Sequence, residues 1–222
     1  MSRLVRLLVA GVVAAGAAAV AIRLPQLGSW HGKDLLAFAL LVAATVAGEQ
    51  LRVSVRFGEQ TKHVTMTETA YAAALLLGVR TSAITLAVLV GIAGVYSVRR
   101  IDAHKVAFNA GSYLAAVTAA EFVFAAARPL GAVAAVPAMA AFFAVNACTV
   151  VGVIALVESR SFGSVFAPIA RLEFGHAGVN LTAGMLLATA WVASPIAIAV
   201  LATVPAVAVT AYRRLQPALL RP

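Results

Sequence analysis

A long apolar run that follows a basic cluster limits most strongly what this chain can fold into. The basic cluster comprises Arg99, Arg100 and Lys105, and Lys105 is the first residue of the run 105–127. The rest of this run is mostly apolar and ends just before Arg128. A helix rises about 1.5 Å per residue, so this run can cross the roughly 30 Å hydrocarbon core of a bilayer. Because basic residues favour the cytoplasmic side, the cluster also predicts the orientation of this helix.

The overall composition extends this interpretation to the whole chain. Hydrophobic residues make up 63% of the 222 residues and charged residues only 11%, which excludes an ordinary soluble domain. The net charge of +9 is distributed between the apolar runs rather than along one face. We therefore expect the basic residues to face anionic lipid headgroups, and we expect no nucleic-acid partner.

The predicted fold class is an all-α polytopic membrane protein, a single integral membrane domain over residues 1–222. The first segment looks like a signal peptide, but its length and the spans that follow predict a retained helix. The third segment is short, so it either begins near Thr65 or forms a re-entrant half-span. Eight apolar segments are predicted, at about 7–24, 34–49, 68–78, 81–98, 105–127, 131–157, 174–192 and 196–212, before a basic tail at 213–222.

The segment from Leu51 to Thr67 differs in character, because polar and apolar residues alternate in it with a period of two. This alternation predicts a small amphipathic β-hairpin at the cytoplasmic interface. Such a hairpin would serve as a ligand-gated flap or a partner contact. The alternative is a simple connector in which the alternation is incidental.

The distribution of basic residues predicts the topology. With the N-terminus inside, only Arg23, Lys33, Arg80 and Arg128 of the 17 Lys and Arg residues fall outside. This bias predicts a bacterial cytoplasmic (inner) membrane protein with both termini in the cytoplasm. Trp30 and Trp191 then lie at the outer interface, a depth that amphipathic aromatic side chains favour.

Motifs for enzymatic chemistry are missing from the sequence. It contains no HExxH, no GxSxG and no glycine-rich phosphate loop, and its four histidines are scattered. Its one cysteine, Cys148, lies in an apolar run and is expected to be a small packing residue. We therefore predict a protein that is not an enzyme and that holds no metal and no cofactor.

Glu121 is the acid that the predicted spans place most deeply. A carboxylate at that depth costs several kcal/mol unless it is paired, protonated or hydrated. One hypothesis is an outward-facing ligand pocket made by Glu121, Thr118 and Arg80, in which Glu121→Gln would abolish the response to ligand. The alternative is a structural ion pair or a neutral glutamate that bonds to a neighbouring helix.

A second polar set lies nearer the cytoplasmic side and comprises Asn109, Asn146 and Asn180, together with Ser112 and Tyr113. Such residues often form interhelical hydrogen bonds worth about 0.6 kcal/mol each. The default interpretation is therefore structural. The alternative is that the three asparagines form the inner lobe of a binding cavity.

Four stretches resemble a known membrane module. They are VTMTETAYAAALLLGVRTSAITLAVLVGIAG (64–94), RRIDAHKVAFNAGSYLAAVTAA (99–120), FFAVNACTVVGVIALVESRSF (142–162) and TVPAVAVTAYRRL (203–215). The series is similar to the multi-helix module that precedes GGDEF, HD-GYP or histidine kinase domains in bacterial signalling proteins. The resemblance covers roughly residues 50–215 and implies a sensory or regulatory membrane module.

That resemblance carries no catalytic residue, because the chain ends soon after the eighth segment, where an effector domain would begin. We therefore expect a stand-alone sensor that acts through a cytoplasmic signalling protein or as a homo-oligomer, in response to an unknown small ligand. The expected partner-contact residues are Arg52, Arg56, Arg99 and Arg100.

A second hypothesis is a small-solute carrier, similar to the substrate-binding membrane subunit of an energy-coupling-factor transporter. Such subunits are also compact and rich in small residues, although eight spans exceed their usual six. A lipid-modifying enzyme is a third hypothesis, and the lack of a clustered His/Asp/Glu set argues against it.

Overall fold

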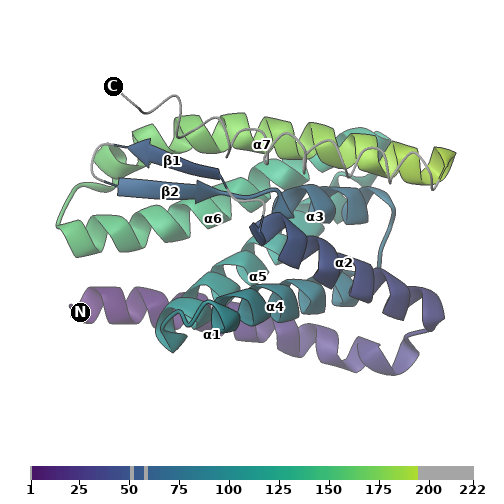
Figure 1. Cartoon of the computed structure of the whole chain (residues 1–222), viewed down its shortest axis with the longest axis horizontal. Helices are drawn as coiled ribbons and strands as arrows, with labels where there is room; N and C mark the ends of the chain where they lie inside the picture. The colour runs from purple at the N-terminus through teal and green to yellow at the C-terminus, as the bar shows by residue number, and fades with distance from the viewer. Residues whose placement is uncertain (1, 51–52, 58–59, 195–222) are drawn as a thin grey trace.

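The computed structural model describes residues 2–50, 53–57 and 60–194, which form a bundle of roughly aligned helices with one pair of strands (Figure 1). The predicted helical class is thereby confirmed. The elements are α1 (Arg3–Arg23), η1 (Leu24–Ser29), α2 (Gly32–Gln50), β1 (Val53–Phe57), β2 (Gln60–Val64), α3 (Thr67–Leu76), α4 (Thr81–Val98), α5 (Ala103–Ala126), η2 (Arg128–Ala134), α6 (Ala135–Glu158) and α7 (Phe162–Ala193).

Four helical segments in the described part of the chain are long and apolar enough to cross a membrane. The predicted eighth segment, 196–212, lies outside the described residues, as does the tail at 213–222. The four segments are Arg3–Ser29, Thr81–Val98, Ala103–Ala126 and Arg128–Glu158.

The strands β1 and β2 lie within the stretch where the sequence alternates. They pair antiparallel, with Val53 opposite Val64 and Phe57 opposite Gln60. Figure 1 places this pair at the same end of the bundle as the N-terminus. The placement of the hairpin at a membrane interface remains a prediction.

One predicted helix start is wrong, and a second differs from the observed start by about one turn. The last described helix, α7, begins at Phe162 rather than near 174, because the Ser161 side chain caps it by accepting from the Ser164 N–H. Helix α6 begins at Ala135 rather than 131. There the chain first passes through η2, where Gly131 has φ +60°, a conformation that glycine adopts without steric cost.

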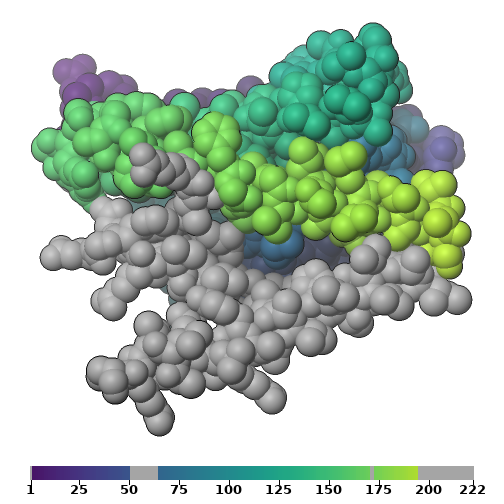
Figure 2. Space-filling model, turned by 90° about the horizontal axis from the view of Figure 1, so that it is seen from above, coloured from purple at the N-terminus to yellow at the C-terminus, as the bar shows by residue number. Residues whose placement is uncertain are grey.

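The short helix α3 lies in the middle of the bundle. Eight of its ten residues are buried, and Tyr71 and Ala72 are almost fully enclosed. Against it packs α7, where a Cβ added at Gly184 would lie 2.6 Å from the Ala72 Cβ. Figure 2 shows α7 crossing the full width of the face that it covers.

The crossing of α1 and α5 depends on two facing glycines. A Cβ added at Gly16 would lie 2.6 Å from the Cα of Gly111, and one at Gly111 would lie 2.8 Å from the Val12 carbonyl oxygen. Small residues allow transmembrane backbones to approach this closely. This contact holds α1 against α5, so that α1 can form one wall of the cavity described next.

Candidate functional site

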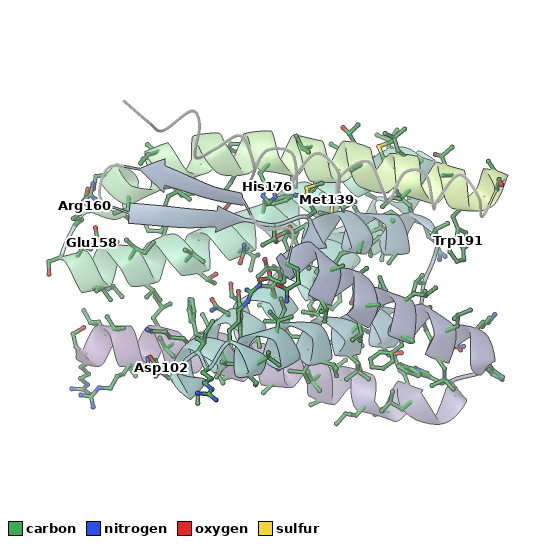
Figure 3. The ribbon with its side chains drawn as sticks, viewed as in Figure 1. Asp102, Met139, Glu158, Arg160, His176 and Trp191 are labelled. Atoms are coloured by element: carbon green, nitrogen blue, oxygen red, sulfur yellow. The ribbon has the colours of Figure 1, made fainter. Side chains whose placement is uncertain are left out.

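A cavity of about 580 Å³ lies where α1, α2, α4, α5 and α6 meet, at the end of the bundle that carries the basic cluster. We call it the Arg99 cavity. Figure 3 marks this end by Asp102, Glu158 and Arg160, and the opposite end by Trp191. Its volume falls in the range of about 300–1,000 Å³ that is usual for small-molecule sites.

Arg99 joins the ends of two helices at the cavity. It follows the last residue of α4, and its guanidinium donates to the Glu49 carboxylate at 3.2 Å and to the Glu49 carbonyl at 2.7 Å. The carbonyl lies in the last turn of α2, where backbone acceptors lack helical partners. Arg99 therefore neutralises a buried acid and caps α2 at the same time.

The first turn of α5 adds His104 and Lys105 to the lining, and both residues are exposed. Lys105 lies 3.1 Å from Asp102, and each of these side chains is 61% exposed. Ion pairs as exposed as this contribute little, because solvent screens them. The mouth of the cavity therefore carries an exposed ammonium group that is held only weakly by Asp102.

One wall of the Arg99 cavity is apolar. It is formed by Val5 and Val9 of α1 together with Val153 and Val157 of α6. Val5 is buried, whereas Val157 is 64% exposed and lies at the edge of the bundle. The site thus combines an exposed ammonium group at its mouth with an aliphatic wall that extends to the surface of the bundle.

Behind the cavity lies a buried polar network. Tyr113, which lines the cavity, donates to the Glu68 carboxylate of α3 at 2.9 Å. Thr65, which also lines it, donates to the other Glu68 oxygen at 3.4 Å. The side chains of Glu68 and of His176 on α7 are only 3% and 8% exposed, and they approach within 3.9 Å.

His176 links the network to the chain that leaves the strand pair. The His176 Nε2 lies 2.6 Å from the Thr65 carbonyl oxygen, to which it donates in the tautomer that carries the hydrogen on Nε2. Nδ1 lies 3.8 Å from a Glu173 oxygen, and the ring packs edge-on against Phe143. The Asn180 side chain contacts both the His176 ring and Thr69. Side chains of α3, α5 and α7 thus converge directly behind the cavity.

The predicted asparagines lie in three different places. Asn109 lines the Arg99 cavity, Asn180 belongs to the buried network, and Asn146 accepts from Ser112 at 3.0 Å between α5 and α6. They do not form one lobe. The structural alternative applies to Asn146, because its bond to Ser112 joins two helices.

The expected pocket of Glu121, Thr118 and Arg80 is not assembled. Glu121 pairs with Arg23 at 2.7 Å, whereas Arg80 pairs with Asp34 at 3.1 Å. The ion-pair alternative therefore describes Glu121, although its partner is on α1. The Thr118 hydroxyl is buried, and no hydrogen-bond partner for it appears among the described residues.

The four arginines expected to contact a partner also lie in different places. The Arg99 side chain turns inward to Glu49 and is only 19% exposed. Arg100 is exposed, with φ +54° at the turn between α4 and α5. Arg56 lies in β1, and Arg52 lies outside the described residues.

A second hollow, of about 760 Å³, lies between α2, α3 and α7 and is lined mainly by alanine and leucine. At one end, Asp34 lies in the first turn of α2, ahead of the apolar run that begins at Leu35. The His31 N–H and the Arg80 guanidinium both donate to the Asp34 carboxylate, at 2.9 and 3.1 Å. Arg80 compensates Asp34, and Lys33 lines the same end of an otherwise apolar groove.

Sequence reasoning missed Glu49, Glu68 and His176. Two signals were present: Glu68 lies among threonines at 65, 67 and 69, and His176 and Asn180 are four residues apart on one helix face. Within the described residues, no group of three His, Cys, Asp or Glu side chains could hold a metal ion.

Tyr113→Phe tests whether the network contributes to stability. The variant leaves Glu68 without its phenolic donor, and we expect a loss of about 1.5–3 kcal/mol, as for hydrogen bonds to charged groups. Tyr71→Phe is the matched control, because it removes only the 3.0 Å contact with the Thr45 hydroxyl, worth about 1 kcal/mol. Thermal unfolding in detergent measures both. Equal losses would show that the bond to Glu68 has no special weight.

In comparisons with protein-family models, with curated proteins and with solved structures, no match to this chain was found.

Proposed function

We propose that this chain is an integral membrane sensory or regulatory module that binds a small ligand in the Arg99 cavity and acts through a cytoplasmic partner. One observation carries the proposal: the cavity shares Tyr113 and Thr65 with a buried network that ties together α3, α5 and α7. A ligand that touches these two side chains can therefore alter helix contacts. The resemblance to modules of bacterial signalling proteins agrees with this role.

The proposed placement is in the bacterial inner membrane, with eight spans and both termini in the cytoplasm. Its support comes from the four apolar helices and from the excess of basic residues on one side. In Figure 3, Asp102, Glu158 and Arg160 lie at one end and Trp191 at the other, as the predicted topology requires. The cavity then opens toward the cytoplasm. The short α3 is accommodated as a half-span because it is buried in protein.

The proposed signal passes through His176. The His176 ring contacts the Thr65 carbonyl, and Thr65 follows directly after β2. His176 itself lies about midway along α7, between the labelled Arg160 and Trp191 (Figure 3). Movement of Thr65 would shift the strand pair and the cytoplasmic start of α7 together. The strand pair, which carries Arg56, and the exposed Arg100 at the turn before α5 are the proposed contact for a signalling protein or a second copy of the chain.

A small-solute carrier is the second candidate. The buried ionisable side chains of Glu68, Glu173 and His176 favour it, since such groups at membrane depth often line ion or substrate pathways. Against it, the fully buried Ile84, Val88 and Phe142 fill the halves of α4 and α6 that lie far from the cavity. This packing separates the Arg99 cavity from the other end of the bundle.

Native mass spectrometry of protein extracted gently from its own membranes tests the proposal. We expect a bound small molecule that is lost in Val153→Phe, because the larger side chain fills the cavity. Val136→Phe is the control, because Val136 is on the same helix, is 49% exposed and does not line the cavity. A co-purifying kinase, cyclase or phosphodiesterase would support the regulatory role. ATPases with a coupling subunit would favour the carrier, and equal adducts in both variants would contradict a ligand in this cavity.

A further inference from the structure

We infer that the ligand of the Arg99 cavity is an anionic amphiphile, a phosphate or carboxylate group attached to an apolar chain. The inference rests on the proposed function, since it names the chemical class of the ligand of that same cavity. Two features of the lining carry it: the distribution of charge at the mouth, and the aliphatic wall that extends to the edge of the bundle.

The charged lining residues select for a negative group. Glu49 is the sole carboxylate that lines the cavity in the described part of the chain, and Arg99 already neutralises it. Lys105 remains at the mouth, where its partner Asp102 lies 3.1 Å away, is exposed and does not line the cavity, so that their ion pair is weak. A ligand anion at the mouth would therefore take the place of Asp102 beside the Lys105 ammonium group. Basic pockets between helices on the cytoplasmic side are a general means of binding anionic headgroups.

The apolar wall selects for a chain on that anion. Val5, Val9 and Val153 offer no hydrogen-bonding side-chain groups, so a small inorganic anion would leave this surface uncovered. Val157 continues the wall to the bundle surface, where it is 64% exposed. An apolar chain can therefore run from the cavity along the valines toward the bilayer. Each buried methylene would contribute about 0.8 kcal/mol.

Along α5, the charged residues of the cavity lie nearer the proposed membrane surface than its uncharged polar residues, as such a ligand requires. His104 and Lys105 lie in the first turn of α5, at the level of the headgroups in the proposed topology. Asn109 and Tyr113 follow one and two turns deeper along the same helix and also line the cavity. A headgroup at Lys105 thus places the adjoining part of the ligand next to Tyr113, the residue that connects to Glu68.

Two sources could supply this chemistry, a membrane phospholipid or a soluble fatty acid, and the experiment separates them. Purified full-length protein in a neutral detergent is titrated with dioctanoyl phosphatidic acid, dodecanoate, dioctanoyl phosphatidylcholine and inorganic phosphate, and binding is read by native mass spectrometry. We expect one or both anionic amphiphiles to bind at least tenfold more tightly than phosphatidylcholine or phosphate. Preference for the phosphatidic acid indicates a phospholipid source, and preference for dodecanoate a soluble one.

Lys105→Gln and Lys33→Gln form the matched pair of variants. Both lysines are exposed and lie in the first turn of a helix, but Lys33 is on α2 and does not line the Arg99 cavity. Removing one basic residue near a headgroup should weaken binding about fivefold. We expect that loss for Lys105→Gln and unchanged binding for Lys33→Gln, with unchanged thermal unfolding in both.

Three results would overturn the inference. In the first, phosphatidylcholine binds as tightly as both anionic amphiphiles. In the second, inorganic phosphate binds as tightly as they do. In the third, Lys105→Gln and Lys33→Gln weaken binding equally. An uncharged native adduct that Val153→Phe removes would overturn the anionic class and leave the proposed function standing. The absence of any adduct, native or added, would overturn both.

Discussion

Gly16→Ala is expected to separate α1 from α5 and to destabilise the protein by about 1–3 kcal/mol, the usual cost of overpacking. The new methyl group would lie 2.6 Å from the Cα of Gly111, and a backbone atom cannot rotate away as a side chain can. Because Val5 and Val9 of α1 line the Arg99 cavity, the same variant should also weaken ligand binding. Thermal unfolding in detergent measures the first effect.

Gly11→Ala is the control for this prediction. Gly11 is exposed on the same helix, and an added Cβ would meet nothing within 4 Å. Alanine is favoured over glycine in a helix interior by roughly 0.5–1 kcal/mol, so this variant should be neutral or slightly stabilising. Equal stability of the two variants would contradict the close crossing of α1 and α5.

His176→Ala is expected to have the largest effect of any single substitution in the buried network. It removes the donor to the Thr65 carbonyl and leaves Glu68 and Glu173 facing an empty space. Truncation of a large buried side chain to alanine typically costs about 2–5 kcal/mol through the cavity that it leaves, and a buried polar group left without its partner adds about 1–3 kcal/mol. We expect a correspondingly large drop in the unfolding temperature, or loss of folded protein on extraction.

Two further variants keep this prediction testable if His176→Ala fails to fold. His176→Gln retains a side-chain N–H near Thr65 and should recover part of the stability. His104→Ala removes an exposed histidine and should change stability by less than about 0.5 kcal/mol, as for ordinary surface positions. If His176→Gln and His104→Ala unfold alike, the network does not stabilise the bundle.

The helices were predictable from sequence because apolar length and breaking residues are local signals. The segment 34–49 corresponds to α2 and the segment 105–127 to α5. The start of α7 was not predictable in the same way. The residues from Ser161 to Glu173 are too polar to resemble a membrane span, yet the Ser161 cap and the packing of Val165 and Ala170 place them in a helix.

The candidate site was predictable only in part, because its contacts join distant segments. The cavity lies at the end that carries the basic cluster at Arg99, whereas the sequence analysis placed its main ligand pocket at Glu121, toward the opposite end. The partner of Glu121 is 98 residues away, and 111 residues separate Thr65 from His176. Helix and strand periodicities relate only residues a few positions apart, so they could not predict contacts at these sequence separations. The close packing of Gly184 on α3, a tertiary property, brings α7 and Glu68 together.

The claim that the Arg99 cavity opens to the cytoplasm from a membrane-embedded bundle is tested most directly by labelling with a membrane-impermeant maleimide. Cysteine is placed at Lys105 or at Lys33, both exposed, in a Cys148→Ala background that removes the chain's one native thiol. We predict that Lys33→Cys is labelled in right-side-out spheroplasts and Lys105→Cys only in inside-out vesicles. Labelling of Lys105→Cys from outside, or of both positions from the same side, would contradict the account.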